Sequence, residues 1–402
     1  MKRKAVLILA LAGTLLPGLA SAQDKSIRIG VLNDQSGPYA DFQGIGSVIA
    51  AQMAVEDYGG TVAGRKIDVV SADHQNKTDV GANIARAWID RDGVDLIVDV
   101  PNSAVALAVS NIAREKNKVL IGSGAGSAEL TGRQCSPNTV HWTYDTWSLG
   151  HSIAHAVVQR GGKNWFFLTA DYAFGHDLER QASEQVQKDG GTVLGTARHP
   201  VGTPDFSSFL LRAQSSGAQV LGLANAGADE TTAIKQAVEF GLTQQMSLVG
   251  LVFDLNNVPA LGMQTAQGIL TVNAWYWDLS DPSREFAKRF AARHPKRDMP
   301  NHHQAGVYAG VLHYLKAVDK AGSAENGKAV VSAMKALPTD DPLFGKGSVR
   351  QDGRAIHPMY LLQVKTPEQS KSTWDVFNVL TTIPGEDAFR PLEAGGCPLV
   401  QK

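Results

Sequence analysis

The chain has 402 residues, of which 43% are hydrophobic and 19% charged, and its formal net charge is −1 at pH 7. This length predicts about two domains, and the near-neutral charge excludes the basic face that nucleic-acid binding requires. Beyond the first 22 residues no stretch is apolar enough to span a membrane, which excludes an integral membrane protein.

The first 22 residues have the composition of a secretion signal. Residues 2–4 are Lys-Arg-Lys, residues 5–20 are mostly apolar, and Ala20-Ser21-Ala22 is a small-residue cleavage site before Gln23. We therefore predict cleavage after Ala22 and export of the mature chain. Because no cysteine follows the cleavage site, we expect no lipid anchor there.

Behind this segment, predicted strands and helices alternate, a pattern that favours parallel sheets covered by helices. The predicted strands are 27–32, 66–72, 96–100, 119–122, 164–169, 192–196, 220–224, 247–250 and 270–272. The predicted helices are 46–58, 80–91, 103–116, 144–160, 177–189, 206–215, 229–240, 284–294, 303–321 and 327–336. Near the C-terminus, 345–350 and 359–364 predict the two strands of a hairpin.

Three polar turns follow predicted strands, and none of them carries a catalytic motif. They are Ser36-Gly37-Pro38, Ser123-Gly124-Ala125-Gly126-Ser127 and Tyr172-Ala173-Phe174-Gly175. In open α/β sheets ligands bind outside the carboxyl ends of the strands, and helix N-termini there favour carboxylates. The first turn offers neither a nucleophile nor a metal ligand nor a phosphate-binding lysine. The sequence therefore indicates a protein that binds a small molecule without transforming it.

The same turns carry a family resemblance. Gly30-Val31 with Ser36-Gly37-Pro38, Gly122-Ser123-Gly124-Ala125 with Glu129-Leu130-Thr131, and Tyr172-Ala173-Phe174-Gly175 together resemble the periplasmic solute-binding proteins of branched-chain amino-acid-type ABC transporters. The resemblance implies an α/β fold of two Rossmann-like lobes joined by a three-crossover hinge, the type I or Venus-flytrap arrangement, with the ligand in the cleft. It places lobe 1 at 23–145 plus 275–355 and lobe 2 at 146–274 plus 356–402.

The resemblance also implies how the protein works and where its ligand binds. We expect a periplasmic, monomeric, non-enzymatic protein with no cofactor, a small carboxylate as ligand and a membrane permease as partner. The turns at Asn102, Ser103, Ala104 and at Ala125, Gly126, Ser127 would hold the ligand carboxylate. The other candidate binding residues are Tyr39, Phe42, Tyr144, Asp145 and His303 from lobe 1, and Tyr172, Phe174, Asn225, Phe253 and Asp254 from lobe 2.

Two departures from the family pattern bear on the ligand. The family holds an α-ammonium group with an acidic side chain in a Gly-Pro-Glu-like turn, but the matching stretch Gly250-Leu251-Val252-Phe253 is apolar, and Asp254 lies one or two residues away. An ammonium buried without a partner costs several kcal/mol. The block Trp142-Thr143-Tyr144-Asp145-Thr146 resembles the subgroup that binds aromatic acids, and aromatic rings stack on planar ligands. The sequence favours a benzoate- or hydroxycinnamate-like acid; a branched-chain amino-acid binder and a ligand-sensing receptor module stay open.

Other candidate sites are weaker. Gly122-x-Gly124-x-Gly126 lacks the dinucleotide spacing, and His151 with His155 has no third ligand nearby, so we predict no metal site. No G-x-S-x-G motif supports a hydrolase. His303 is interpreted either as a donor to the ligand or as a surface histidine at a helix start.

The two cysteines, Cys135 and Cys397, are the whole cysteine content of the chain. An even number in an exported protein favours a disulfide. Two separate thiols are the alternative.

Overall fold

The computed structural model describes residues 26–400. The predicted signal peptide, residues 1–22, and its cleavage site therefore lie outside the described residues. Across the described range, no helix combines the length and the apolar composition that a membrane span requires.

The first sheet has six strands in the order β2-β3-β1-β4-β5-β6. Strands β1 (Ile27–Asn33), β3 (Arg65–Asp73), β4 (Val94–Asp99), β5 (Val119–Gly122) and β6 (Thr139–His141) run parallel, and the short β2 (Thr61–Val62) is antiparallel to β3. Every residue of β4 and β5 is buried, as expected for parallel strands covered on both faces.

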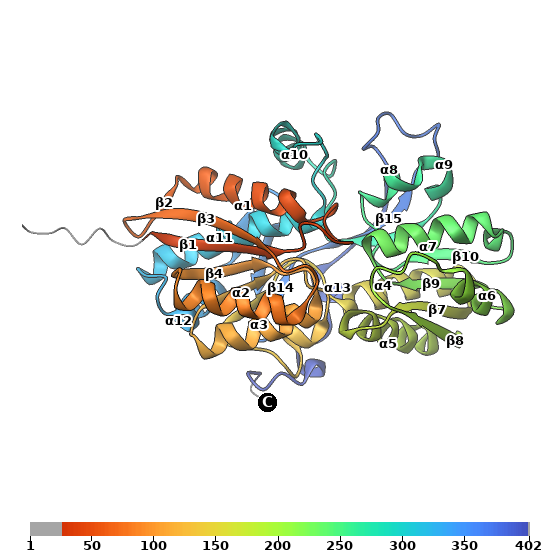
Figure 1. Ribbon diagram of the computed structural model, residues 1–402, viewed down its shortest axis with the longest axis horizontal. Coiled ribbons are helices and arrows are strands. Elements are labelled where there is room, and N and C mark those ends of the chain that lie inside the picture. The colour runs from red at the N-terminus through yellow and green to blue at the C-terminus, as the bar shows by residue number, and fades with distance from the viewer. Residues whose placement is uncertain (1–25, 401–402) are drawn as a thin grey trace, which may run out of the picture.

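Helices cover both faces of this sheet. Helices α1 (Gly44–Tyr58), α11 (His302–Ala321) and α12 (Gly327–Ala336) share one hydrophobic cluster with it, and α2 (Thr78–Asp90) and α3 (Ser103–Glu115) share another. The sheet and these five helices form the first sheet unit, on the left of Figure 1.

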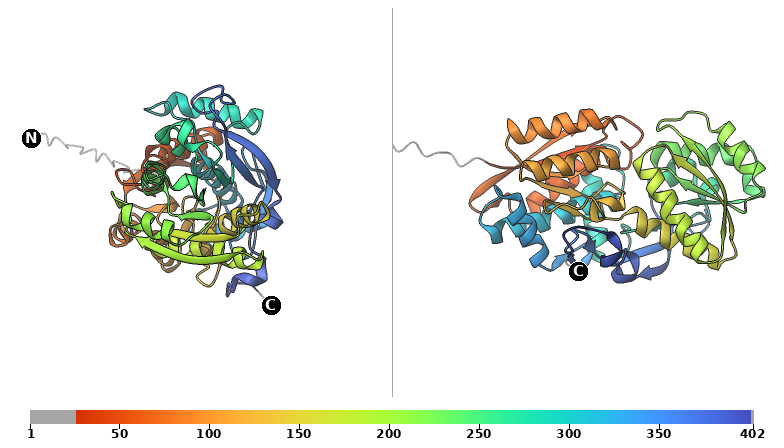
Figure 2. Two further views of the ribbon diagram at one scale, coloured as in Figure 1. Left: turned by 90° about the vertical axis from the view of Figure 1, so that its right-hand side faces the viewer. Right: turned by 90° about the horizontal axis from the view of Figure 1, so that it is seen from below.

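The second sheet is smaller and also parallel. Its strands β7 (Asn164–Ala170), β8 (Thr192–His199), β9 (Val220–Ala224) and β10 (Ser247–Gly250) lie in the order β10-β9-β7-β8. Helices α4 (Thr146–Gln159) and α5 (Ala173–Lys188) pack on one face, and α6 (Ser207–Ser215) and α7 (Gly227–Glu239) on the other. This second sheet unit lies on the right of Figure 1, and the view from below in Figure 2 separates the two units equally clearly. Two parallel sheets with helices on both faces confirm the predicted α/β class.

Two small antiparallel sheets complete the fold. One contains β11 (Leu270–Asn273), β15 (Met359–Val364) and β16 (Phe377–Ile383); the other contains β12 (Thr339–Asp341), β13 (Gly345–Val349) and β14 (Ala355–Ile356). The predicted hairpin between 345–350 and 359–364 is wrong, because β13 pairs with β12 and β14 while β15 pairs with β11 and β16. The nearer β14 takes the place that the prediction gave to β15.

The remaining helices are short, apart from α10 (Asp281–Arg293). They are α8 (Asn257–Leu261), α9 (Met263–Ala266), α13 (Gly385–Ala388) and the 3-10 turns η1 (Ala128–Thr131), η2 (Leu242–Gln244) and η3 (Leu392–Gly395).

The largest difference between a predicted and an observed helix start is in α5. Helix α5 starts at Ala173 and not at residue 177, and Gly175 lies in its first turn. A Cβ atom on Gly175 would lie 2.1 Å from the carbonyl oxygen of Ala170. The glycine is therefore needed for close packing of the helix start on the strand before it, and it does not mark a loop.

Cys135 and Cys397 form a disulfide with their Cα atoms 5.6 Å apart. The bond ties the C-terminal segment to the loop that follows η1, across a sequence separation of 262 residues. The alternative of two separate thiols is wrong.

Candidate functional site

Aromatic side chains from both sheet units meet between the carboxyl ends of the two parallel sheets. Tyr39, Phe42, Tyr144 and Phe174 belong to one buried cluster, and Tyr172 packs against it. The ring centroids of Tyr39 and Phe42 are 5.3 Å apart, and those of Tyr172 and Phe174 are 5.9 Å apart. The structure therefore brings five of the candidate binding residues together, and we call these five rings the aromatic wall.

The two sheet units also touch through backbone beside the aromatic wall. The N–H of Ala228 donates to the carbonyl oxygen of Pro38 at 3.2 Å. Next to it Gly227 has φ +64°, and a Cβ there would lie 2.5 Å from the Pro38 oxygen and 2.8 Å from the Phe42 ring. Only glycine allows so close an approach in this conformation.

The two turns predicted to hold a carboxylate do lie side by side, but the structure already provides oxygens for the N–H groups of Ala104, Gly126 and Ser127. The side-chain oxygen of Asn102 accepts from the N–H of Ala104 at 3.0 Å and caps α3. The hydroxyl of Ser103 accepts from the N–H groups of Gly126 at 3.3 Å and Ser127 at 3.1 Å. Ala125, which precedes Gly126 in the second turn, is fully buried.

An anion does sit at the start of η1, and it belongs to the chain itself. The Oδ2 atom of Asp177, on α5, accepts from the N–H of Ala128 at 3.0 Å, from the Ser127 hydroxyl at 3.1 Å and from the Thr146 hydroxyl at 2.6 Å. A carboxylate at such a position is stabilised by the free N–H groups of the turn. This contact joins the second sheet unit to the first.

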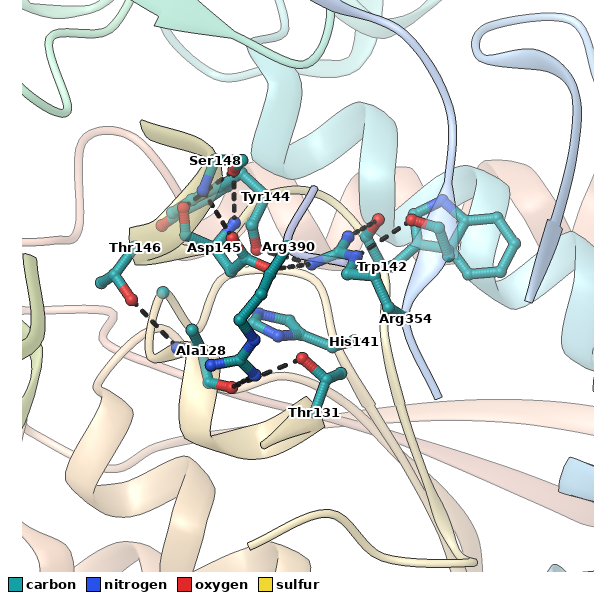
Figure 3. A network of polar contacts seen from close by, with 12 residues as sticks. Ala128, Thr131, His141, Trp142, Tyr144, Asp145, Thr146, Ser148, Arg354 and Arg390 are labelled. Carbon is teal, nitrogen blue, oxygen red and sulfur yellow. Dashed lines mark hydrogen bonds and ion pairs between the residues drawn. The ribbon is translucent and has the colours of Figure 1, made fainter. Parts of the chain in front are cut away.

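Asp145 has structural partners. Its side chain accepts from the N–H of Ser148 at 2.7 Å and caps α4, and it lies 3.6 Å from the guanidinium of Arg354, which is fully buried. Arg354 also donates to the carbonyl oxygens of Trp142 and Tyr144, so one arginine holds the whole segment before α4 (Figure 3). Burial is the largest single influence and would by itself raise the pKa of Asp145. Arg354, His141 and the N–H of Ser148 together outweigh it, and the pKa is lowered.

Two other candidate binding residues, Asn225 and Phe253, contact side chains outside the aromatic wall. The Asn225 side-chain nitrogen lies 3.1 Å from Nε2 of His199, and its buried oxygen has no hydrogen-bond partner among the described residues. Phe253 is fully buried in the cluster that α6 and α7 form with the second sheet, apart from the aromatic wall.

His303 and Asp254 come together next to Phe42 and Tyr144 of the aromatic wall. Asn301 caps α11, and this places His302 and His303 in the first turn of that helix. Nε2 of His303 lies 3.1 Å from Oδ2 of Asp254, and its ring lies 4.9 Å from that of Phe42. His303 is fully buried, so its interpretation as a surface histidine is wrong.

Burial dominates the charge states in this region. It lowers the pKa of His302 and of His303 to about 3 and raises the pKa of Asp254. Both imidazoles are therefore neutral at pH 7.

Sequence reasoning missed two residues here. His302 stacks on Tyr144 with centroids 5.1 Å apart, and its only signal in the sequence is its position next to His303. Glu230 is fully buried in the first turn of α7, and neither of its carboxyl oxygens has a hydrogen-bond partner among the described residues. Burial and then the nearby Asp254 raise its pKa well above the usual range. In the sequence it resembles an ordinary acidic residue at a helix start.

Asp254, His302 and His303 are also the single group of three or more possible metal-binding side chains that comes together within residues 26–400. The sequence did not predict it, because the aspartate and the histidines are almost fifty positions apart. The sequence suggested that no acidic side chain is available for the ammonium group of an amino acid, because the expected turn position is apolar. The structure nevertheless buries two carboxyl groups in this region, those of Glu230 and Asp254.

The sequence of the chain matches a known protein family. Residues 26–371 match the periplasmic binding protein family. The chain belongs to this family. As a periplasmic binding protein it is the substrate-binding component of an ABC transporter, a class that binds its ligand without catalysing a reaction.

Several solved or curated relatives cover nearly the whole chain. A periplasmic binding protein from Burkholderia mallei is 50% identical, with a TM-score of 0.91 over 94% of this chain and 99% of that one. A branched-chain amino acid ABC transporter periplasmic ligand-binding protein from Burkholderia xenovorans LB400 is 39% identical, with a TM-score of 0.82 over 93% and 100%. Leu/Ile/Val-binding protein homolog 6 from Brucella melitensis is 25% identical over 88% of this chain and 90% of its own length.

A fourth protein shares the fold at lower identity. It is an ABC-transporter solute-binding protein from R. palustris, solved in complex with benzoate, which is 22% identical with a TM-score of 0.82 over 93% of this chain and 100% of that one. The resemblance seen in the turns is thus confirmed for the family.

Proposed function

We propose that this periplasmic binding protein captures a small aromatic carboxylate of the benzoate or hydroxycinnamate type. The observation that carries the proposal is the aromatic wall, in which rings from both sheet units belong to one cluster and the hydroxyl groups of Tyr39 and Tyr172 meet. A planar ring bound there would stack against tyrosine and phenylalanine from either side. The benzoate bound by the R. palustris protein is consistent with this ligand class.

Capture would proceed by hinge closure of two lobes with the limits predicted from the sequence. A ligand favours closure only if it gains contacts that exist in the closed state and not in the open one. Tyr39 and Tyr172, whose hydroxyl oxygens lie 2.7 Å apart, join the two sheet units here, so a ligand beside them would gain contacts with both units only on closure. The closed form would then be recognised by the membrane permease. Export through the N-terminal signal, a periplasmic location and a monomeric state belong to this proposal.

A branched-chain amino acid is the second candidate. It is favoured by the two buried carboxyl groups of Glu230 and Asp254, either of which could receive an ammonium group. The name of the Burkholderia xenovorans relative points in the same direction.

A melting-temperature screen distinguishes the two candidates. The purified chain would be titrated with benzoate, 4-hydroxybenzoate, 4-hydroxycinnamate, leucine, isoleucine and valine. A ligand present at a thousand times its Kd stabilises the folded state by about 4 kcal/mol, a shift that is easily measured. We expect stabilisation by the aromatic acids. Stabilisation by leucine and its analogues alone would reject the aromatic assignment and leave the binding-protein assignment in place.

A further inference from the structure

The tautomer of His302 is fixed by the backbone. Its Nδ1 atom lies 3.1 Å from the backbone nitrogen of Ala274, whose N–H points at it. A backbone N–H can only donate, so Nδ1 must carry the lone pair. A neutral imidazole has one N–H, and that N–H is therefore on Nε2.

Whether this Nε2–H has an acceptor among the described residues depends on the tautomer of His303. Oδ2 of Asp254 lies 3.8 Å from His302 Nε2, too far for a hydrogen bond, but 3.1 Å from His303 Nε2. The contact between His303 Nε2 and Asp254 Oδ2 is close but not aligned as a hydrogen bond, because Oδ2 has no hydrogen-bond partner among the described residues. If Nε2 of His303 carries a proton, the Nε2–H of His302 faces that second N–H, with the two nitrogens 3.1 Å apart, and is unsatisfied.

The other tautomer of His303 also leaves a polar atom unpaired. The Gln43 amide beside Nδ1 of His303, at 3.2 Å, can present its nitrogen or its oxygen, so it permits both tautomers. If His303 accepts from His302, Oδ2 of Asp254 is left facing no donor. In either arrangement at least one polar atom of the three is unpaired, and an unpaired buried polar atom is destabilising.

A metal ion does not satisfy the three atoms. Their separations of 3.1, 3.1 and 3.8 Å are near the roughly 3.3 Å expected between tetrahedral zinc ligands. However, a metal needs the lone pair on Nε2, and a metal-binding histidine donates its other N–H. The N–H of Ala274 imposes the opposite arrangement on His302.

A hydroxyl group does satisfy them, because it accepts one hydrogen bond and donates another. It can accept from His302 Nε2–H and donate to Asp254 Oδ2 while His303 takes either role. An ammonium group can donate to Asp254 but cannot accept from His302, and an ether oxygen can only accept. A carboxylate would meet the carboxyl groups of Asp254 and Glu230, both buried in this region.

We propose that His302 and Asp254 form a recognition site for a hydroxyl group on the ligand ring, with the backbone N–H of Ala274 as the positioning group that holds His302 in the required tautomer. This inference rests on the proposed aromatic-acid function and selects within it a hydroxylated ring, such as that of 4-hydroxybenzoate. The ligand carboxylate then lies at the end of the ring away from Asp254.

Calorimetric titration of the exported chain with matched ligands tests the inference. Benzoate lacks the hydroxyl, 4-methoxybenzoate can only accept at that position, and 4-hydroxybenzoate can do both. We expect 4-hydroxybenzoate to bind at least about tenfold more tightly than either analogue, as expected for hydrogen bonds to a buried polar pair.

Two variants of nearly equal size separate the donor from the packing of the ring. His302→Gln keeps an N–H donor, and His302→Met removes it. We expect the hydroxyl preference to survive in the first variant and to disappear in the second. Equal binding of the three acids by the wild-type chain, or a preference that persists in His302→Met, would overturn the inference while leaving the aromatic-acid function intact. Binding of none of the three acids would overturn both.

Two measurements do not depend on ligand affinity. Nitrogen NMR of chain labelled with 15N-histidine, with His302 assigned by comparison with His302→Gln, should give an unprotonated Nδ1 and a protonated Nε2. A protonated Nδ1 would contradict the inference. Titration of the wild-type chain with Co2+ should give no visible absorption band. A band that appears in the wild-type chain and is lost in Asp254→Asn would identify a metal site and contradict the inference.

Discussion

The hydroxyl oxygens of Tyr39 and Tyr172 lie 2.7 Å apart and join the turn after β1 to the turn after β7. These two turns belong to different sheet units, so this hydrogen bond exists only while the units are in contact. The same region contains the backbone contact between Pro38 and Ala228. Closure can therefore be tested with substitutions that leave each sheet unit intact.

Tyr172→Phe removes the hydroxyl contact and little else. A net hydrogen bond contributes about 0.5–1.5 kcal/mol, so we expect ligand affinity to fall by about 2- to 10-fold. The measurement is calorimetric titration with the acid that gives the largest melting shift. Tyr58→Phe is the matched control, because its hydroxyl donates to Leu315 within the first sheet unit. An unchanged Kd in Tyr172→Phe would mean that the contact contributes nothing to closure.

Gly227→Ala should prevent close approach of the two units. The new Cβ would overlap the Pro38 oxygen, in a backbone conformation that already disfavours alanine. Gly241→Ala is the matched control, since Gly241 has a similar φ of +71° and a Cβ added there would have no neighbour within 4 Å. We expect both variants to lose about 1 kcal/mol of stability, and only Gly227→Ala to lose affinity, by tenfold or more. Equal affinities in the two variants would contradict the proposed closure.

Arg354→Leu should be strongly destabilising. The guanidinium is fully buried, donates to two carbonyl oxygens and lies beside Asp145, whose buried charge would lose its ion-pair partner. Removing one member of a buried pair costs about 3–5 kcal/mol, to be measured by urea denaturation. Arg133→Leu, which removes an exposed pair with Glu129, should cost less than about 1 kcal/mol. A similar small loss at Arg354 would show that its contacts are replaceable.

Removing the disulfide should lower stability without altering the site. For a loop of this length the chain-entropy relation gives roughly 5 kcal/mol as an upper value. The Cys135→Ser, Cys397→Ser double variant should therefore unfold at lower urea concentration, and its C-terminal segment should be cut faster by protease. The ligand affinity should stay the same, because neither cysteine belongs to the aromatic wall. Identical urea midpoints for oxidised and double-variant protein would contradict this.

Buried histidines should make the protein sensitive to acid. Burial lowers the pKa of His141 to about 3, while the unfolded chain has the ordinary value of 6.5. The folded state thus binds fewer protons than the unfolded state between these pH values. The stability from this group is complete above pH 6.5 and is lost as the pH falls toward 3, by up to about 1.4 kcal/mol per pH unit.

His141→Gln tests that slope. Urea midpoints measured from pH 7 to pH 4.5 should fall less steeply in the variant than in the wild type. Asp99 acts in the opposite direction, because burial raises its pKa to about 7 and its contribution weakens as the pH rises from about 4 to 7. Parallel pH profiles for variant and wild type would show that His141 is not the group responsible.

Local patterns were sufficient for most of the fold. Strands such as β4 and β5 are continuous apolar runs between helical segments, and a buried parallel strand has this pattern whatever its neighbours are. Strand β16 was missed because Val379 and Leu380 are exposed and its burial pattern does not alternate. Its existence depends on pairing with β15, which no local pattern encodes.

The candidate site divides in the same way. The turns at Ser103 and at 125–127 could be placed side by side from the sequence, since carboxyl ends of parallel strands share one edge of a sheet. The sequence could not show that a carboxylate of the chain itself already binds there, because Asp177 accepts from the N–H of Ala128 from 49 positions away in the chain. Glu230 was missed because the sequence does not reveal that this helix-start acid is buried.

By itself the sequence determined the alternation of strands and helices, the family, and the gathering of aromatic residues at strand ends, because these follow from periodicity and short motifs. Only the tertiary structure decided which hydrogen-bonding groups are already paired and which remain unsatisfied. That distinction depends on partners distant in the chain, as when Ala274 fixes the proton of His302. The residue type determines which hydrogen bonds a side chain can make. Its surroundings in the folded protein determine which of its donors and acceptors remain unpaired.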